Sequence, residues 1–323
     1  MGEHVLDVYL DEDHAARELR ADVRAGLTAD PRWTPPKWFY DARGSELFEE
    51  ITRLPEYYPT RTESAILAER AGAVARLTEA KTLIELGSGS SEKTRLLLDA
   101  LVGHGTLGAF VPLDVSASAL RAAVTALTGA YPGLSVRGVV GDMTEHLRHL
   151  PDGDNRLIAF LGGTIGNLIP AERTVFLSSL RSVLHEGEWL LLGADLVKDP
   201  AVLVPAYDDA AGVTAAFNRN VLYVINRELG ADFDPLAFQH VARWNPDHEW
   251  IEMRLRSIRD QRVGIPALDL DLAFAAGEEL RTEISAKFRR DGLTGELDAA
   301  GFAVRQWWTD PRGWFSVTLA QAR

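Results

Sequence analysis

Cysteine is absent from the 323 residues, so the chain has no disulfide and no thiolate nucleophile or metal ligand. The H-E-x-x-H motif of zinc peptidases and the G-x-S-x-G motif of serine hydrolases are missing as well. His146 and His149 have no third ligand near them in the sequence, so we expect no metal site. A cysteine-free composition is compatible with a reducing compartment, and we expect a cytoplasmic protein.

Long apolar segments and excess positive charge are also absent. No run of residues is apolar and long enough to cross a bilayer, and the acidic N-terminal segment has no signal-peptide core. The chain has 34 Lys and Arg against 47 Asp and Glu, a formal net charge of −13. Nucleic acids and anionic membranes attract positively charged surfaces. We therefore expect neither as a partner, and instead a small molecule bound by a monomer.

Residues 82 to 197 alternate between short apolar runs and helical stretches, which predicts strands that form a parallel sheet. The predicted strands cover 82–86, 109–115, 135–142, 157–163 and 188–197, with helices at 91–101, 116–130 and 171–184. A helix at 293–300 then precedes two strand-like segments around the turn Pro311-Arg312-Gly313, which predicts a terminal antiparallel hairpin. This order of elements is that of a class I methyltransferase dependent on S-adenosylmethionine (SAM), a Rossmann-like α/β fold.

The remaining residues predict a second unit. Helical pieces at 15–27 and 45–54 end near prolines, and Thr60-x-x-Glu63 resembles a capping box that begins a helix at 61–77. Residues 198–287 begin with helical patterns and include one strand-like stretch, 250–257. We expect a SAM-binding domain and an inserted substrate-binding domain over the carboxyl edge of its sheet. The first comprises residues 63–197 and 288–323, the second residues 1–62 and 198–287.

The glycine-rich segment GSGSSEKT, residues 87–94, follows the first predicted strand and precedes a helix. A P-loop and a dinucleotide fingerprint both require glycine where this sequence has Glu92. The remaining interpretation is SAM, whose binding loop resembles E-x-G-x-G, here residues 85–89. Because SAM carries no phosphate, its loop does not need the third glycine.

Acidic residues end the next two predicted strands. Asp114 ends the second strand, where a carboxylate can accept hydrogen bonds from both ribose hydroxyls. Asp142 ends the third strand, where a carboxylate can accept from the adenine amino group. Both positions favour SAM. The alternative is that the two acids only cap the helices that follow them, as Asp often does.

Several stretches resemble the histidine Nα-methyltransferases of ergothioneine biosynthesis. The likeness covers nearly the whole chain and is carried by PPKWFYDARGSELFEEITRLPEYYPTRTE, IELGSGSSEKT, LGGTIGNL, LLLGADLVKD, YDDAAGVTAAFNRNVL, FAAGEEL and RTEISAKF. The resemblance implies an enzyme that uses SAM to convert L-histidine to its trimethylated betaine, hercynine. It implies SAM-binding residues at Gly87, Lys93, Asp114, Asp142 and Met143, and histidine-binding residues at Tyr40, Tyr57, Asn167, Tyr207, Glu283 and Ser285. Met143 departs from the aromatic residue expected beside adenine, although its thioether can cover the ring.

Methyl transfer from a sulfonium needs close approach and a free amine lone pair, but neither a metal nor a covalent intermediate. Asn167 and Tyr207 suit the substrate carboxylate and amine, and an acid and a hydroxyl at Glu283 and Ser285 suit the two imidazole nitrogens. No catalytic residue is assigned. Tyr40 is a candidate for steering the departing proton to water.

Simpler interpretations of these residues stay open. Asn167 could be a turn residue, Tyr207 a packed aromatic, and the pair Glu283 and Ser285 ordinary surface groups. Rival functions are an N-methyltransferase of the same family acting on another aromatic amino acid or amine, and a non-catalytic SAM-binding module. A dehydrogenase is a third, disfavoured by Glu92.

Overall fold

The computed structural model describes residues 5–10, 12–89, 91 and 93–323, so Glu92 lies outside the described residues. The chain divides into two compact units. Unit 1 comprises Met1–Leu10, Pro59–Val197 and Phe288–Arg323, and unit 2 comprises Asp11–Tyr58 and Lys198–Lys287. Within the described ranges, no helix is both long enough and apolar enough to cross a membrane.

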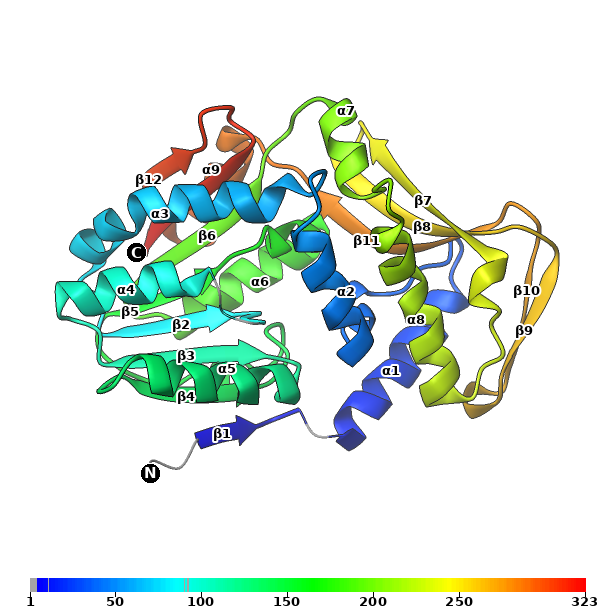
Figure 1. Ribbon diagram of the computed structural model, residues 1–323, viewed down its shortest axis with the longest axis horizontal. Helices are drawn as coiled ribbons and strands as arrows, with labels where there is room; N and C mark the ends of the chain where they lie inside the picture. Colours follow the sequence, from blue (N-terminus) through cyan, green and yellow to red (C-terminus); the bar gives the residue numbers. More distant parts are fainter. Residues whose placement is uncertain (1–4, 11, 90, 92) are drawn as a thin grey trace. The chain divides into compact units, whose positions relative to one another are not determined.

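Unit 1 is built on an eight-stranded sheet with the order β1-β4-β3-β2-β5-β6-β13-β12 (Figure 1). The first six of these strands run parallel to one another, and the last two are antiparallel to their neighbours. The strands are β1 (Val5–Val8), β2 (Thr82–Leu86), β3 (Ala109–Asp114), β4 (Ser135–Val140), β5 (Arg156–Phe160), β6 (Trp189–Asp195), β12 (Phe302–Thr309) and β13 (Phe315–Ala322). The predicted parallel sheet and terminal hairpin are confirmed, and the order from β4 to β12 is that of a class I methyltransferase.

The helices of unit 1 cover this sheet with apolar faces. They are α3 (Tyr58–Thr78), α4 (Thr94–His104), α5 (Ala117–Ala130), α6 (Pro170–Val183) and α9 (Arg290–Ala299), with 3-10 turns η2 (Leu147–His149) and η3 (Thr164–Asn167). One core cluster joins Leu67 of α3 and Leu97 of α4 to Leu83, Leu157 and Leu191 of the central strands. These central strands are buried on both faces, which is why they read as continuous apolar runs in the sequence.

The N-terminal strand corrects the expected domain boundary. Residues 1–62 were predicted to lie entirely in the second unit, but β1 pairs in parallel with β4 at the edge of the sheet in unit 1. Leu6 and Leu10 pack against the buried cluster of Leu120, Val124 and Val140. This strand has only four residues and lies in an acidic segment. Four residues are too few to show the alternation of apolar and polar side chains that identifies a strand in a sequence.

Unit 2 combines helices with small antiparallel sheets. Its elements are α1 (Glu12–Leu27), η1 (Pro36–Phe39), α2 (Ala42–Thr52), α7 (Pro200–Leu203), η4 (Val204–Ala206), α8 (Val213–Leu229), η5 (Pro235–Ala237), β7 (Phe238–Asn245), β8 (Trp250–Ser257), β9 (Gln261–Ile265), η6 (Pro266–Leu268), β10 (Leu270–Phe274) and β11 (Glu279–Ala286). The predicted stretch 250–257 is confirmed as β8, the centre of a sheet with the order β11-β8-β7. The pair β9 and β10 forms a separate hairpin that was not predicted.

A buried ion pair joins β5 to the start of β6. The guanidinium of Arg156 donates to the carboxylate of Glu188 at 2.7 Å, and both side chains are at most 5% exposed. Arg156 also donates to the carbonyl oxygens of Val183 and Pro151. Burial raises the pKa of Glu188, but hydrogen bonds from Arg156 and from backbone amides more than offset it, so the net pKa is lowered.

We expect Arg156→Ala to lower the free energy of unfolding by about 3–5 kcal/mol, because it leaves a buried carboxylate without its partner. The matched control is Arg137→Ala, which breaks the pair with Asp7 where the arginine is 47% exposed, and should cost about 1 kcal/mol or less. Urea denaturation of both variants measures the difference. Because the pKa of Glu188 is lower in the folded protein than its unfolded value of 4.5, the ionised carboxylate stabilises the fold at pH values above 4.5. The difference in unfolding free energy between wild type and Arg156→Ala should therefore shrink as the pH falls below 4.5. Equal losses in the two variants would contradict the buried-pair interpretation.

Candidate active site

The glycine loop after β2 has the backbone that its sequence requires. Gly87 and Gly89 have φ values of 66° and 48°, in the left-handed region that favours glycine. A Cβ added at either position would meet no described heavy atom within 4 Å, so open space lies beside both glycines. The hydroxyl of Ser88 is buried and has no hydrogen-bond partner among the described residues. An orphaned hydroxyl beside open space fits a polar ligand such as the amino-acid part of SAM.

Glu85, the acid of the E-x-G-x-G motif, fastens this loop to α4. Its carboxylate accepts hydrogen bonds from the hydroxyls of Ser91, at 3.2 Å, and Thr94. Burial raises the pKa of Glu85 to about 7, although hydrogen bonds from the two hydroxyls and the charge of Lys93 lower it. The acid therefore has a structural role under the loop, which explains why the motif begins with a carboxylate.

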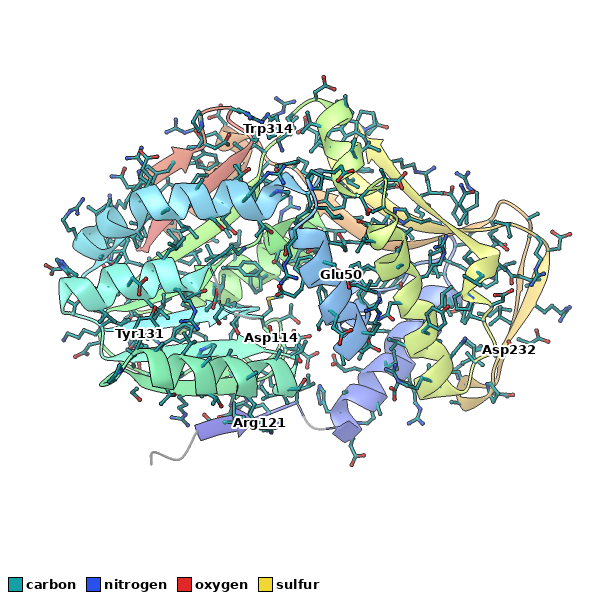
Figure 2. The ribbon with its side chains drawn as sticks, viewed as in Figure 1. Glu50, Asp114, Arg121, Tyr131, Asp232 and Trp314 are labelled. Atoms are coloured by element: carbon teal, nitrogen blue, oxygen red, sulfur yellow. The ribbon has the colours of Figure 1, made fainter. Side chains whose placement is uncertain are left out.

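Asp114 lies at the end of β3, where Figure 2 labels it. Its Oδ2 accepts from the Gly89 backbone N–H at 2.9 Å and its Oδ1 accepts from the Ser116 N–H at 2.9 Å. Burial raises the pKa of Asp114, while these backbone hydrogen bonds lower it. The helix α5 that follows is capped by Ser116, so the alternative in which Asp114 is only a helix cap does not hold. The acid instead connects the end of β3 to the glycine loop.

Asp142 follows β4 and is also not a helix cap. Its Oδ1 accepts from the backbone N–H and hydroxyl of Thr144, at 2.6 and 2.5 Å, and its own N–H donates to Nδ1 of buried His146. The N-cap position of the next helical element, η2, is occupied by His146, whose side chain makes no capping hydrogen bond. Met143 follows Asp142 in the chain and is half-buried.

Lys93 is held by a residue that the sequence analysis interpreted differently. Glu63 was expected to complete a capping box, but α3 begins at Tyr58 and the Glu63 carboxylate is fully buried inside unit 1. It accepts from Lys93 Nζ at 2.5 Å and from the Gly162 backbone N–H at 2.9 Å. A Cβ at Gly193 would lie 1.9 Å from this carboxylate, so β6 needs a glycine there.

Asn167 ends the turn η3, which is separated from the end of β5 by three residues. The consecutive residues Gly162 and Gly163 both have positive φ values and turn the chain at the end of the strand. Asn167 is half-buried, and the backbone N–H of Gly166 before it bonds to the Gly163 carbonyl oxygen. The predicted SAM residues and Asn167 thus all lie at or just beyond the carboxyl ends of strands in unit 1, where ligands of open α/β sheets bind.

The three predicted tyrosines are brought together in unit 2 by two phenylalanines. Tyr40 packs edge-on against Phe48 and Phe217, with ring centroids 5.6 and 5.5 Å apart. Phe48 packs against Tyr57, and Tyr57 against Tyr207, at 6.2 and 6.3 Å. Phe48 and Phe217 were not predicted as site residues, because aromatic residues at helical positions ordinarily indicate core. Tyr40 remains 36% exposed, which leaves part of this aromatic cluster accessible.

Ser285 and Tyr207 are in direct contact. Their hydroxyl oxygens are 2.7 Å apart, and Nζ of Lys287 donates to both at 2.8 Å. Lys287 is only 4% exposed and was not identified from the sequence, where lysine ordinarily indicates surface. Glu283 and Ser285 both lie on β11, two residues apart, so they share a face of the strand as expected.

A second buried network fixes the backbone of Tyr207. His240 Nε2 lies 2.7 Å from the Tyr207 carbonyl oxygen, and His240 Nδ1 lies 2.8 Å from the side-chain amide nitrogen of Asn218. Because that amide only donates, His240 is neutral with its proton on Nε2. The amide oxygen of Asn218 accepts from Thr282 on β11 at 2.6 Å. Burial lowers the pKa of His240, which favours this neutral form.

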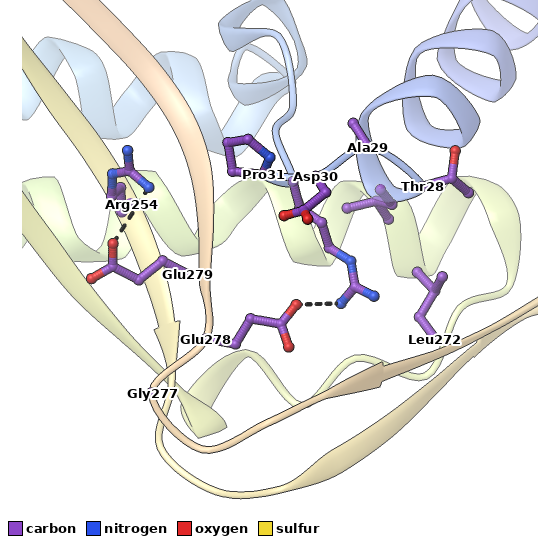
Figure 3. A pocket seen from close by; sticks show the side chains of 11 residues that line it. Thr28, Ala29, Asp30, Pro31, Arg254, Leu272, Gly277, Glu278 and Glu279 are labelled. Atoms are coloured by element: carbon purple, nitrogen blue, oxygen red, sulfur yellow. Dashed lines mark ion pairs between the residues drawn. The ribbon is translucent and has the colours of Figure 1, made fainter.

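One cavity in unit 2 lies apart from the predicted site residues. It has a volume of about 690 Å³ and is lined by residues that include Arg32, Arg254, Glu278 and Glu279 (Figure 3). These four side chains pair with one another across the lining, Arg32 with Glu278 at 2.8 Å and Arg254 with Glu279 at 3.4 Å. Its described lining residues include none of the predicted site residues.

We expect Asp114→Ala to weaken SAM binding by about 1.5–3 kcal/mol, the range for hydrogen bonds that involve a charged group. Asp114→Asn is the matched control, because its amide oxygen can still accept from Gly89 while the charge is lost. Calorimetric titration of SAM into both variants separates the ribose contact from the support of the loop. An unchanged SAM affinity in Asp114→Ala would remove this residue from the site.

Comparison with known proteins agrees with the predicted family. Residues 19–322 match the family model described as histidine-specific methyltransferase, SAM-dependent. A histidine N-alpha-methyltransferase of Mycolicibacterium smegmatis is 58% identical over 312 residues, which cover 97% of each chain. The protein of the same name from Mycobacterium tuberculosis is 57% identical, again covering 97% of each chain. A 4-dimethylallyltryptophan N-methyltransferase of Claviceps purpurea is 27% identical, covering 63% of this chain and 62% of its own.

These matches run through both units and confirm the resemblance that the sequence motifs carried. SAM, the expected cofactor, is the methyl donor that the family's description names. The chain therefore belongs to the family of histidine-specific, SAM-dependent methyltransferases.

Proposed function

We propose that the protein trimethylates the α-amino group of L-histidine to give hercynine, the first step of ergothioneine biosynthesis. The observation that carries this proposal is the near-complete match to relatives named histidine N-alpha-methyltransferase. The chain retains the polar residues that the chemistry needs in both units, from Asp114 and Asp142 to Tyr207 and Ser285.

In unit 1, the chain's part is to bind and orient the methyl donor. Asp114 accepts from the ribose, Asp142 accepts from the adenine amino group, and Met143 covers the adenine ring. Gly87 lets the backbone approach the methionine part, and the Glu63 carboxylate holds the Lys93 ammonium in place beside the loop. SAM supplies an electrophilic methyl group on a sulfonium.

Histidine is recognised through its separate ends. The Asn167 amide, just beyond β5, binds the carboxylate and amine. Glu283 on β11 accepts from one imidazole N–H, and Ser285, two residues further, bonds the other ring nitrogen. The phenols of Tyr40, Tyr57 and Tyr207 supply the aromatic wall. No strong base is needed, because an α-amine has a pKa of about 8 in peptides. The amine of a free amino acid is somewhat more basic, so only a minor fraction of the substrate is unprotonated near neutral pH. Tyr40 is the candidate that steers the departing proton to water.

A rival substrate is another aromatic amino acid, as the name of the Claviceps relative suggests for that protein. Glu283 and Ser285 argue for imidazole, because this ring offers one donor and one acceptor at the same time. A phenyl ring offers neither, and an indole offers only a donor, which would leave Ser285 unmatched. All residues named in this proposal come from one chain, so it requires no nucleic acid, no membrane and no second protomer. We expect a cytoplasmic monomer.

We expect Glu283→Ala to reduce kcat/KM for histidine by roughly 10- to 100-fold, because an imidazole N–H then lacks its acceptor. The ratio of activities on tryptophan and histidine should rise in the same variant. The control is Glu279→Ala at the other end of β11, whose carboxylate pairs with Arg256 at 2.7 Å. Steady-state assays on both amino acids decide, and an undiminished kcat/KM for histidine in Glu283→Ala would exclude the role.

The whole proposal is tested by incubating the enzyme with SAM and each of the twenty amino acids and reading product masses over time. Histidine should give monomethyl and dimethyl species that feed a trimethyl product, and the reaction should stop there because the quaternary nitrogen has no lone pair. The quaternary cation can lie against the accessible face of Tyr40, a contact worth roughly 0.5–2 kcal/mol. Methylation of a ring nitrogen, or turnover of a different amino acid only, would reject the assignment.

A further inference from the structure

One turn of α8 carries two side chains that contact the segment around Tyr40. The ring of Phe217 packs edge-on against the ring of Tyr40, with centroids 5.5 Å apart. Asn220 lies three residues further along the helix and therefore on the same face. Its side-chain nitrogen is 3.0 Å from the Phe39 carbonyl oxygen and 2.8 Å from Oδ1 of Asp41. The helix thus holds both the ring of Tyr40 and the residues on either side of it.

The two hydrogen bonds of Asn220 have fixed directions. A backbone carbonyl only accepts, so the atom that faces Phe39 must be the amide nitrogen. An ionised carboxylate also only accepts. Burial raises the pKa of Asp41, but hydrogen bonds from a backbone amide and two side chains more than offset it, so the net pKa is lowered. Asn220 therefore donates one hydrogen bond to each neighbour of Tyr40 in the chain.

The contact between this segment and α8 is close. Asp41 is the N-cap of α2, and its Oδ1 also accepts from the Gly44 backbone N–H at 2.8 Å. A Cβ at Gly44 would lie 1.7 Å from the Phe39 carbonyl oxygen and 2.9 Å from the side-chain nitrogen of Asn220, so this position of α2 needs a glycine. Asn220 is only 4% exposed, whereas Tyr40 is 36% exposed. A buried amide therefore fixes the backbone that carries an accessible phenol.

We propose that Asn220 is a positioning residue for Tyr40, which holds the phenol where it serves the amine of the substrate. This inference rests on the proposed function, in which Tyr40 steers the departing proton to water. Asn220 acts through the backbone at Phe39 and the carboxylate of Asp41. Because a displacement of about 1 Å can strongly reduce the rate of an enzyme, loosening this segment should slow methylation even though every proposed histidine-binding group is still present.

The test is a double-mutant cycle that combines Asn220→Leu with Tyr40→Phe. Leucine has nearly the shape of asparagine but donates no hydrogen bond, and phenylalanine removes only the hydroxyl of the tyrosine. Asn220→Leu should reduce kcat/KM for histidine roughly tenfold. The KM for SAM should stay unchanged, because the predicted SAM-binding residues lie in unit 1. Tyr40→Phe should reduce kcat/KM for histidine at least as much, because it removes the hydroxyl outright.

The double variant separates positioning from a general structural role. In the Tyr40→Phe background, Asn220→Leu should reduce kcat/KM for histidine by less than about twofold, because the hydroxyl that it misplaces is already absent. A substitution that only lowered the fraction of folded enzyme would reduce the activity by the same factor in both backgrounds. If Asn220→Leu does not fold, as judged by its thermal transition, Asn220→Ser takes its place, since a shorter side chain with one donor cannot serve both acceptors.

The matched control is Asn226→Leu, near the end of the same helix. Asn226 also makes two hydrogen bonds to the backbone, accepting from the Phe233 N–H at 3.0 Å and donating to its carbonyl oxygen at 2.8 Å. The segment that it holds, residues 230–234, contains none of the predicted site residues. Asn226→Leu should lower the temperature of thermal unfolding while kcat/KM for histidine stays at the wild-type value.

An unchanged kcat/KM for histidine in Asn220→Leu overturns the inference. The same conclusion follows if the substitution costs equally much with and without the Tyr40 hydroxyl, or if Asn226→Leu loses as much activity as Asn220→Leu. Unaltered kinetics in Tyr40→Phe alone would remove the role of Tyr40 and overturn the inference with it. A wild-type protein that does not methylate histidine rejects the proposed function instead, so the two failures are distinguishable.

Discussion

A buried carboxylate organises the ligand-facing edge of unit 1. Glu63 comes from α3, yet its oxygens accept from the Lys93 ammonium after β2 and from the Gly162 amide after β5. A side chain on Gly193 of β6 would occupy the same space. Removing a charge of this kind from water is unfavourable unless every oxygen is satisfied, so the surrounding chain has little freedom to rearrange. The turn that leads from β5 to Asn167 passes through Gly162, whose amide this carboxylate holds.

Unit 2 uses a neutral network for the same purpose. The chain of hydrogen bonds from Thr282 through Asn218 and His240 to the carbonyl oxygen of Tyr207 joins β11, α8, β7 and the turn after η4. Each member has a defined donor or acceptor role, so the network permits one arrangement of these segments.

The sequence predicted most of unit 1 because buried parallel strands read as continuous apolar runs between helices. It predicted less of unit 2, since β7 has apolar residues at Phe238, Val241 and Ala242, a spacing that also suits a helix, and was not distinguishable from a helical or irregular segment. Site residues were accessible through motifs, but their supporting groups were not. Glu63 resembled a helix cap and Lys287 an ordinary surface lysine, and only the tertiary structure brings each to its partners.

The position of β13 has a consequence for how the chain reaches its fold. This strand lies between β6 and β12, although it follows both in the sequence. All seven residues of β6 are buried in the finished sheet, so before β13 is in place an apolar strand with unpaired backbone groups stands at an edge. That edge persists during synthesis until residues 315–322 leave the ribosome, after all of unit 2 has emerged. The nascent chain therefore stays prone to aggregation at this edge until β13 inserts.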